Sequence, residues 1–121
     1  MTEFDWNNAP TICELNGYRW VLGPDPEEEM DWYESSEWCE SVGGVLPPRT
    51  VLLLASMNPD ISIFFTKDSY WSSSDQSRTQ AWSQCFREGR WAHQDGSCKK
   101  YAYVSARAVR AIKLGELNDN R

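Results

Sequence analysis

The sequence predicts an α+β domain, in which two helices in the first half of the chain are followed by several antiparallel strands. A length of 121 residues allows one hydrophobic core, and 40% hydrophobic residues with seven tryptophans indicate a packed globule. Helical spacing of apolar residues ends before Asn58, whereas β-type segments bounded by turns occur near both ends. We therefore expect one domain over residues 1–121, with its core at about 11–113 and a loose tail at 114–121.

The chain is expected to begin with a β-hairpin. Residues 11–15 and 18–22 flank Asn16-Gly17, a dipeptide that supplies the two positive φ angles of a tight turn. The Gly-Pro-Asp-Pro run at 23–26 then breaks the second strand. This hairpin pairs with the last strand only if the two ends of the chain meet.

A first helix is expected from about Glu27 to Ser41. The helix dipole favours acidic residues at its N-terminus, and Gly43-Gly44 provides a left-handed cap at its end. The residues expected to face the core recur at helical spacing: Trp32, Ser35 or Ser36, Cys39 and Val42.

A second, shorter helix is expected at about 50–57, after Pro47-Pro48 and before the stop signal Asn58-Pro59-Asp60. Residues 61–65 alternate only partly, which favours a short strand or an extended buried segment. The later β-segments are expected around 70–73, 80–87, 90–93 and 101–112, with turns at 88–89 and 95–96 and a polar loop at 75–79.

Charge is distributed unevenly in this chain, whose net charge is −6. Residues 25–40 contain eight acidic residues and no Lys or Arg, whereas residues 99–113 contain five basic residues and no acid. Direct binding to nucleic acid as the main function is not expected, because that binding needs a basic surface. The acidic run predicts either a solvated helix face or a docking surface, for a basic partner or as a mimic of nucleic-acid charge.

The segment 1–8 has no basic stretch and no apolar core, so we do not expect a secretion signal. The longest apolar run, Val51–Ala55, is far shorter than the roughly 20 residues that span a bilayer. We therefore expect the cytoplasm of the producing cell and no membrane association. In that reducing compartment the four cysteines are interpreted as buried free thiols, and two disulfides are the alternative: Cys13, Cys39, Cys85 and Cys98.

Five short signatures occur in a fixed order between residues 32 and 110. They comprise Trp32, Ser35, Trp38 and Cys39; the turn Gly43–Arg49 with Val51 and Leu52; Tyr70–Ser73; Ala81, Trp82, Phe86 and Gly89; and Arg107–Arg110. Together, over about residues 18–112, they resemble the Lcl C-terminal domain family, which is placed with the C-type-lectin-like folds. Pro48 and Val51 stand where the family has Thr and Glu, which indicates a divergent member. No ligand contact is therefore carried over from this turn.

The resemblance implies a C-type-lectin-like fold, with two helices packed on antiparallel sheets and with the two termini close together. It implies no reaction, because such folds serve adhesins, receptor binders and structural modules alike. Small single-domain versions look most like bacteriophage proteins. The leading hypothesis is therefore a non-catalytic virion component, such as a capsid decoration or a tail-associated protein.

Two alternatives belong to other classes. One is an intracellular phage inhibitor of a host nucleic-acid enzyme or defence system, acting through the acidic surface, and the other is a sugar-binding adhesin module. The expected partner is thus a viral structural subunit or a host protein, and a homo-oligomer is compatible. The candidate partner-binding residues are Glu28, Asp31, Glu34, Glu37, Trp38, Asp75, Arg78 and Trp91.

No catalytic residue, cofactor or metal site is predicted. Asn58-Pro59-Asp60 faintly resembles a lectin calcium loop, but no Trp-Asn-Asp strand accompanies it, so we interpret it as a helix stop. The Ser72–Ser74 run is expected to satisfy backbone groups beside a buried Trp71. A pair of Cys39 with His93 is not expected, because Cys39 is assigned to the core.

The seven tryptophans divide into two sets. Trp32, Trp71 and Trp82 belong to the signatures and are expected in the core. Any exposed members of the second set are candidates for an interface: Trp6, Trp20, Trp38 and Trp91.

Overall fold

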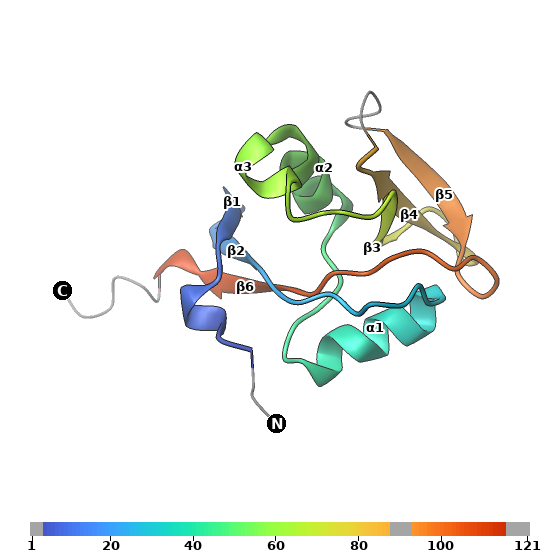
Figure 1. Cartoon of the computed structure of the whole chain (residues 1–121), viewed down its shortest axis with the longest axis horizontal. Coiled ribbons are helices and arrows are strands. Elements are labelled where there is room, and N and C mark those ends of the chain that lie inside the picture. The colour runs from blue at the N-terminus through green and yellow to red at the C-terminus, as the bar shows by residue number, and fades with distance from the viewer. Residues whose placement is uncertain (1–3, 88–92, 116–121) are drawn as a thin grey trace.

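The chain has the predicted α+β class in a computed structural model that describes residues 4–87 and 93–115. Two three-stranded antiparallel sheets, ordered β1-β2-β6 and β3-β4-β5, lie toward opposite ends of the long axis, with α1 on one side and α2 and α3 on the other (Figure 1). The elements in chain order are the 3-10 turn η1 (Trp6–Asn8), β1 (Thr11–Leu15), β2 (Tyr18–Leu22), α1 (Trp32–Ser41), α2 (Arg49–Met57), α3 (Pro59–Ser62), β3 (Ser69–Asp75), β4 (Gln80–Cys85), β5 (Gln94–Cys98) and β6 (Val109–Lys113).

The first sheet confirms the hairpin and its pairing with the last strand. Asn16 and Gly17 have φ angles of 55° and 83°, the positive values that the tight turn needs. β2 then pairs with β6, from Tyr18 opposite Lys113 to Leu22 opposite Val109. The expectation of close termini concerns residues 1–3 and 116–121, which lie outside the described residues, as does most of the predicted tail.

Helix α1 begins at Trp32, so the expected start at Glu27 is wrong. Asp31 caps the helix by accepting from the backbone N–H of Glu34, and the Glu34 carboxylate accepts from the N–H of Asp31 in return. The preceding residue, Met30, is held in a bridge to Val104. The acidic residues at 27–29 therefore precede the helix and do not form its first turn.

The end of α1 is the left-handed cap that Gly43-Gly44 predicts. Gly43 has a φ of 87°, and its N–H donates to the Glu40 carbonyl at 3.0 Å. The N–H of Gly44 donates to the Cys39 carbonyl at 2.9 Å, which completes a Schellman motif.

Helix α2 is confirmed almost as predicted, and Asn58 ends it. The strand or extended segment expected at 61–65 is wrong, because the short helix α3 occupies Pro59–Ser62. The Asn58 side chain accepts from the N–H of Asp60, and Pro59 takes the first helical position, so the same residues stop one helix and start the next.

The second sheet departs from the prediction at its last strand. Asp95 and Gly96, expected as a turn, lie inside β5 opposite Ser83 and Trp82 of β4. A Cβ on Gly96 would overlap the Gln76 side chain, so this glycine allows a close approach and does not mark a turn. Of the segment expected at 101–112, only residues from Val109 onward form a strand. The turn at 88–89 and residues 90–92 lie outside the described part of the chain.

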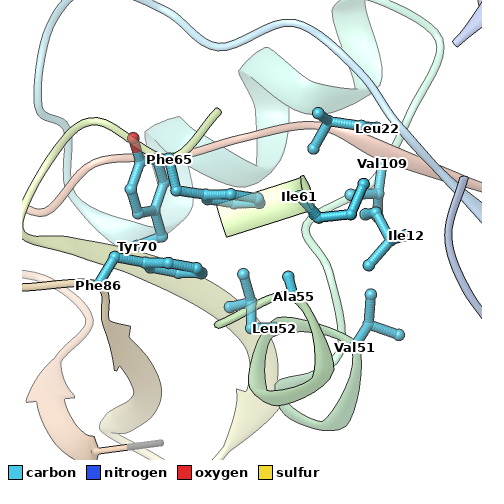
Figure 2. Close-up of a cluster of buried hydrophobic side chains, with 10 residues drawn as sticks. All are labelled: Ile12, Leu22, Val51, Leu52, Ala55, Ile61, Phe65, Tyr70, Phe86 and Val109. Carbon is cyan, nitrogen blue, oxygen red and sulfur yellow. The ribbon is translucent and has the colours of Figure 1, made fainter. Parts of the chain in front are cut away.

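The interior divides into two core clusters. The first core cluster lies between α2, α3 and strands of both sheets (Figure 2), and comprises Ile12, Leu22, Val51, Leu52, Ala55, Ile61, Phe65, Tyr70, Phe86 and Val109. The second core cluster involves α1, and comprises Trp6, Val21, Cys39, Leu46, Trp71, Ala81, Ala106 and Ala108. Neighbouring residues of β3 supply the two clusters, because side chains alternate along a strand: Tyr70 belongs to the first and Trp71 to the second.

The tryptophans do not divide as their signatures predict. Trp71 is fully buried, but Trp32 and Trp82 are only partly buried, and each has a cation over its ring. The Lys99 ammonium lies 4.6 Å from the Trp32 ring centroid, and the Arg49 guanidinium lies 3.7 Å from that of Trp82. Trp6, left unassigned by the sequence, is buried in the second core cluster.

Candidate functional site

The outer face of α1 and the segment before it form an acidic surface, defined here as Glu27, Glu28, Glu29, Glu34, Glu37 and Glu40, all exposed. Ser35 and Cys39 are buried and mark the side of α1 that faces the core. The glutamates at positions 34, 37 and 40 therefore share the opposite, solvent-facing side. Like charges three residues apart on a helix repel each other by about 0.2–0.5 kcal/mol per pair. This face therefore carries a small electrostatic cost in the isolated chain.

The acidic surface has no cationic partner within the part of the chain that the structure describes. The ion pairs among the described residues are Arg87–Asp68, His93–Asp95, Lys99–Asp75 and Arg107–Asp25. None of them involves one of the six glutamates. Asp25 and Asp31 belong to the same acidic run but have structural roles. Asp25 lies 3.8 Å from the Arg107 guanidinium, and Asp31 caps α1.

The basic residues of 99–113 are used largely inside the fold. Arg107 donates to the carbonyls of Gly23 and Phe64, and Arg110 donates twice to the Gly43 carbonyl while covering the Trp6 ring. The Lys99 side chain is only 8% exposed and lies 2.7 Å from the Asp75 carboxylate. Lys99, Arg107 and Arg110 are therefore committed to backbone carbonyls and to ion pairs with Asp75 and Asp25, and none of them balances the acidic surface.

Exposed tyrosines border the acidic surface. Tyr33 on α1 is 49% exposed, and Tyr101 and Tyr103 are 75% and 62% exposed. Hydrogen bonds from the Trp32 N–H to the Lys99 carbonyl and between Met30 and Val104 hold the segment 99–104 beside the start of α1. Aromatic rings next to carboxylates suit a partner that presents Lys or Arg, since both groups attract cations.

The remaining candidate residues have mixed positions. Trp38 is partly buried and packs against the second core cluster, so it supports α1 more than it extends the acidic surface. Asp75 pairs with the buried Lys99, and the Arg78 carbonyl accepts from the Lys99 ammonium at 3.4 Å, so Asp75 and Lys99 fasten the 75–79 loop. Arg78 is exposed. Trp91 lies outside the described residues.

The Ser72–Ser74 run satisfies backbone groups, as predicted. The Ser72 hydroxyl donates to the Trp82 carbonyl at 2.7 Å, and the Ser74 hydroxyl accepts from the Arg49 N–H at 3.0 Å. These bonds connect the turn before α2 with β3 and β4. The Asn58 side chain is likewise used, as the cap of α3, which supports its interpretation as a helix stop.

The four cysteines are free thiols, as expected, but only Cys39 is buried, whereas Cys13, Cys85 and Cys98 are partly buried. Burial, with a smaller contribution from Glu40, raises the pKa of Cys39 to about 12, so its thiol stays neutral at physiological pH. The cysteine that shares a pocket with His93 is Cys85. The sequence reasoning missed this pair, although a strand through 94–98 opposite 80–85 would have predicted it.

Within the described ranges there is no group of three or more His, Cys, Asp or Glu side chains arranged to hold a metal ion. No helix there is long and apolar enough to cross a membrane. Comparison of the sequence with protein-family models and with curated proteins finds no match. The resemblance to the Lcl C-terminal domain family therefore stays a prediction.

Proposed function

We propose that this protein is a non-catalytic protein-binding module with a C-type-lectin-like fold, which docks on a basic protein partner through its acidic surface. The first context that we propose is a bacteriophage virion, with the protein as a capsid decoration or a tail-associated component. The observation that carries the docking proposal is the set of six exposed glutamates without a cationic partner among the described residues.

The lectin-like assignment is supported by the arrangement of the elements. The first hairpin and the last strand share one sheet, helices α1 and α2 and the short α3 follow the hairpin, and a second antiparallel sheet follows the helices. The signature residues also have roles in this arrangement: Cys39 and Trp71 are buried, and Arg107 and Arg110 bond to distant backbone carbonyls. They act mainly as folding residues, so binding specificity is expected outside them.

The docking part of the proposal is supported by charge. Repulsion between the glutamates on the outer face of α1 is relieved when a partner supplies Lys or Arg. Complementary charge also accelerates association. Exposed charge pairs are screened by salt, with a Debye length of about 8 Å at physiological ionic strength. We therefore expect the contact to weaken as ionic strength rises.

The test uses phage particles purified by density gradient from producing cells. The wild-type protein is expected to sediment with the particles, and the double variant Glu37→Lys/Glu40→Lys is expected to remain at the top of the gradient. Both lysines fall in the C-terminal half of α1, where the helix dipole favours positive charge, so the fold is expected to persist.

A matched control is Glu14→Lys/Asp60→Lys, which changes exposed residues on β1 and α3. Each reversal adds two charges, so both double variants move the net charge from −6 to −2. The control is expected to sediment with the particles. Absence of the wild-type protein from particles contradicts the virion context, and equal loss of the two variants contradicts docking through α1.

The second candidate function, inhibition of a host nucleic-acid enzyme or defence system, is favoured by the same unpaired glutamates. They follow one another from residue 27 along one side of α1 to residue 40, as charges do along a phosphate backbone. Capture of partners from a lysate of phage-producing cells on the immobilised protein, repeated with excess duplex DNA, discriminates the two. An inhibitor loses its captured enzyme to DNA, whereas a virion component keeps its structural subunit.

A further inference from the structure

The outer side of α2 and α3 exposes apolar side chains. Among the described residues, the two most exposed large aliphatic side chains are Ile63 and Met57, at 70% and 64%. Leu54 and Phe64 are also exposed. These four residues are called the apolar surface. Apolar side chains that are exposed together on a folded chain mark an interaction site, whereas scattered ones do not.

The apolar surface lies where α2 and α3 meet. The same two helices turn other residues inward, to the first core cluster: Val51, Leu52, Ala55 and Ile61. Leu54 and Met57 are three residues apart and share a side of α2. The Asn58 carbonyl accepts from the N–H of Ser62 at 2.8 Å, so α3 turns directly at the end of α2. The other two residues of the surface follow α3 at once, and α1 lies on the opposite side of the molecule (Figure 1).

This part of the chain is nearly free of charge. Residues 50–66 contain one charged residue, Asp60, although 25% of all residues in the chain are charged. The acidic surface, in contrast, carries six exposed glutamates on the side of α1. Because the chain has a net charge of −6, two copies repel each other. The repulsion is weakest when they approach through the apolar surface, which keeps the two sets of glutamates farthest apart.

Charge also decides which partner suits this surface. A basic protein complements the acidic surface and gains nothing from an uncharged one. A second copy of this chain presents the same uncharged, apolar surface, and a two-fold axis places the two surfaces against each other. We propose that the apolar surface is the contact of a homodimer, in which α2 and α3 of one copy pack on α2 and α3 of the other.

The edge of the first sheet is the other route by which two copies could join. β1 is at the end of the strand order, and edge strands can pair between chains. However, the register of β1 is interrupted between Thr11 and Cys13, Pro10 directly precedes the strand, and Glu14 is exposed on it. An irregular register, a proline and a charge all oppose pairing at an edge. The contact is therefore assigned to the helices.

The dimer leaves both acidic surfaces accessible, because α1 lies on the opposite side of each copy from α2 and α3 (Figure 1). It thus offers two docking sites at once. Two linked sites increase the avidity for a partner that is itself present in many copies. This consequence rests on the proposed function, whereas the dimer itself does not.

Sedimentation equilibrium of the reduced full chain tests the dimer, over about a hundredfold range of concentration. The average mass is expected to rise with concentration, from that of one chain toward that of two. Met57→Gln/Ile63→Gln makes the two most exposed side chains of the apolar surface polar without adding charge. It is expected to raise the dissociation constant of the dimer by at least about tenfold. Rising ionic strength is expected to preserve or tighten the dimer, because salt screens the repulsion between copies and not the apolar contact.

The matched control is Tyr101→Gln/Tyr103→Gln, which also makes two exposed side chains polar, at 75% and 62%, but beside the acidic surface. It is expected to leave the dissociation constant unchanged, and circular dichroism checks the fold of both double variants. The mass of one chain at every concentration, equal effects of the two double variants, or a dimer that dissociates in salt overturns the proposal. The docking proposal fails separately, in the particle gradient, because Glu37→Lys/Glu40→Lys lies outside the apolar surface.

Discussion

The two helices on opposite sides of the molecule stabilise it in different ways. Helix α1 is polar on its outer face, buries Ser35 and Cys39, and has a side-chain cap at its N-terminus. Helix α2 is apolar, buries Val51, Leu52 and Ala55, and has no side-chain cap. The side of α1 therefore depends on directional polar contacts, and the side of α2 depends on packing.

Tryptophan N–H groups make directional hydrogen bonds in and around the second core cluster. Trp6 donates to the Val42 carbonyl at 3.1 Å, Trp32 to that of Ser72 and Trp71 to that of Met30, both at 2.9 Å. Each bond joins segments more than 30 residues apart in the chain. The first core cluster has one polar side chain, that of Tyr70, whose hydroxyl accepts from the Lys67 N–H. Its other contacts are hydrophobic, including the stacked rings of Phe65 and Phe86.

This difference has a functional meaning. Directional hydrogen bonds define the position of a helix more narrowly than hydrophobic contact does, because they depend on both distance and angle. The helix whose outer face we propose as the docking surface is thus the one with the more specified position. A defined charge pattern can contribute to specificity only if its support is rigid.

The largest expected effect is a loss of stability that is greater for a substitution in the second core cluster than for one in the first. Trp71→Ala removes a fully buried indole and its bond to Met30, and it is expected to lower the free energy of unfolding by about 5 kcal/mol. Leu52→Ala, in the first core cluster, removes a smaller buried side chain and no hydrogen bond, and it is expected to cost about 3 kcal/mol. Urea unfolding followed by circular dichroism measures both.

Trp71→Phe serves as the milder companion if Trp71→Ala does not fold. It keeps an aromatic ring in the cluster but loses the N–H donor, and it is expected to cost about 2 kcal/mol. A Trp71→Ala cost at or below that of Leu52→Ala would show that the indole hydrogen bond adds nothing to burial.

The sequence predicts much of the fold, because its turn residues have local meaning. Asn16-Gly17, Gly43-Gly44 and Asn58-Pro59 each act within a few residues, and each is found where the pattern places a turn or a helix end. The shift of the α1 start from Glu27 to Trp32 has a local signal that the prediction missed, the capping box of Asp31 and Glu34, and also a nonlocal cause. Met30 pairs with Val104, a contact that no nearby residue reveals.

The same limit applies to burial and to the candidate site. Trp6 is buried because Gly23 and Gly44 leave room for its ring, as an added Cβ at either glycine would lie under 3 Å from it. This fit joins three distant segments, so spacing along the chain cannot predict it. The acidic surface was visible as a charge run, but its lack of partners became clear only once the basic residues were placed.

A second predicted effect is a loss of folding stability at high pH that Cys39 causes. Its pKa is raised to about 12, mainly by burial, so below about pH 9 the thiol is neutral in both states and the folded form keeps its full stability. Above pH 9 the unfolded chain releases the proton while the folded chain retains it. The free energy of unfolding therefore falls by about 1.4 kcal/mol per pH unit until the folded pKa is reached.

The measurement compares urea unfolding at pH 7.5 and 10.5 under reducing conditions, in wild type and Cys39→Ala. The wild type is expected to lose about 2 kcal/mol more over this interval than the variant, because other titrating groups are common to both. Cys98→Ala, a change at a partly buried thiol, is the control and is expected to retain most of the loss. Equal losses in wild type and Cys39→Ala would mean that Cys39 ionises without unfolding.

The smallest effect tests the cap that distinguishes α1 from α2. Asp31→Ala removes the acceptor for the Glu34 N–H, at 2.8 Å, and is expected to lower the free energy of unfolding by about 1 kcal/mol. Glu37→Ala, on the exposed face of the same helix, is the matched control and is expected to change it by less than about 0.5 kcal/mol. The two variants separate stability from docking, because Glu37→Ala weakens the proposed contact and Asp31→Ala weakens the helix. A stability loss for Glu37→Ala equal to that for Asp31→Ala would assign the acidic face to folding and remove the reason to regard it as a docking surface.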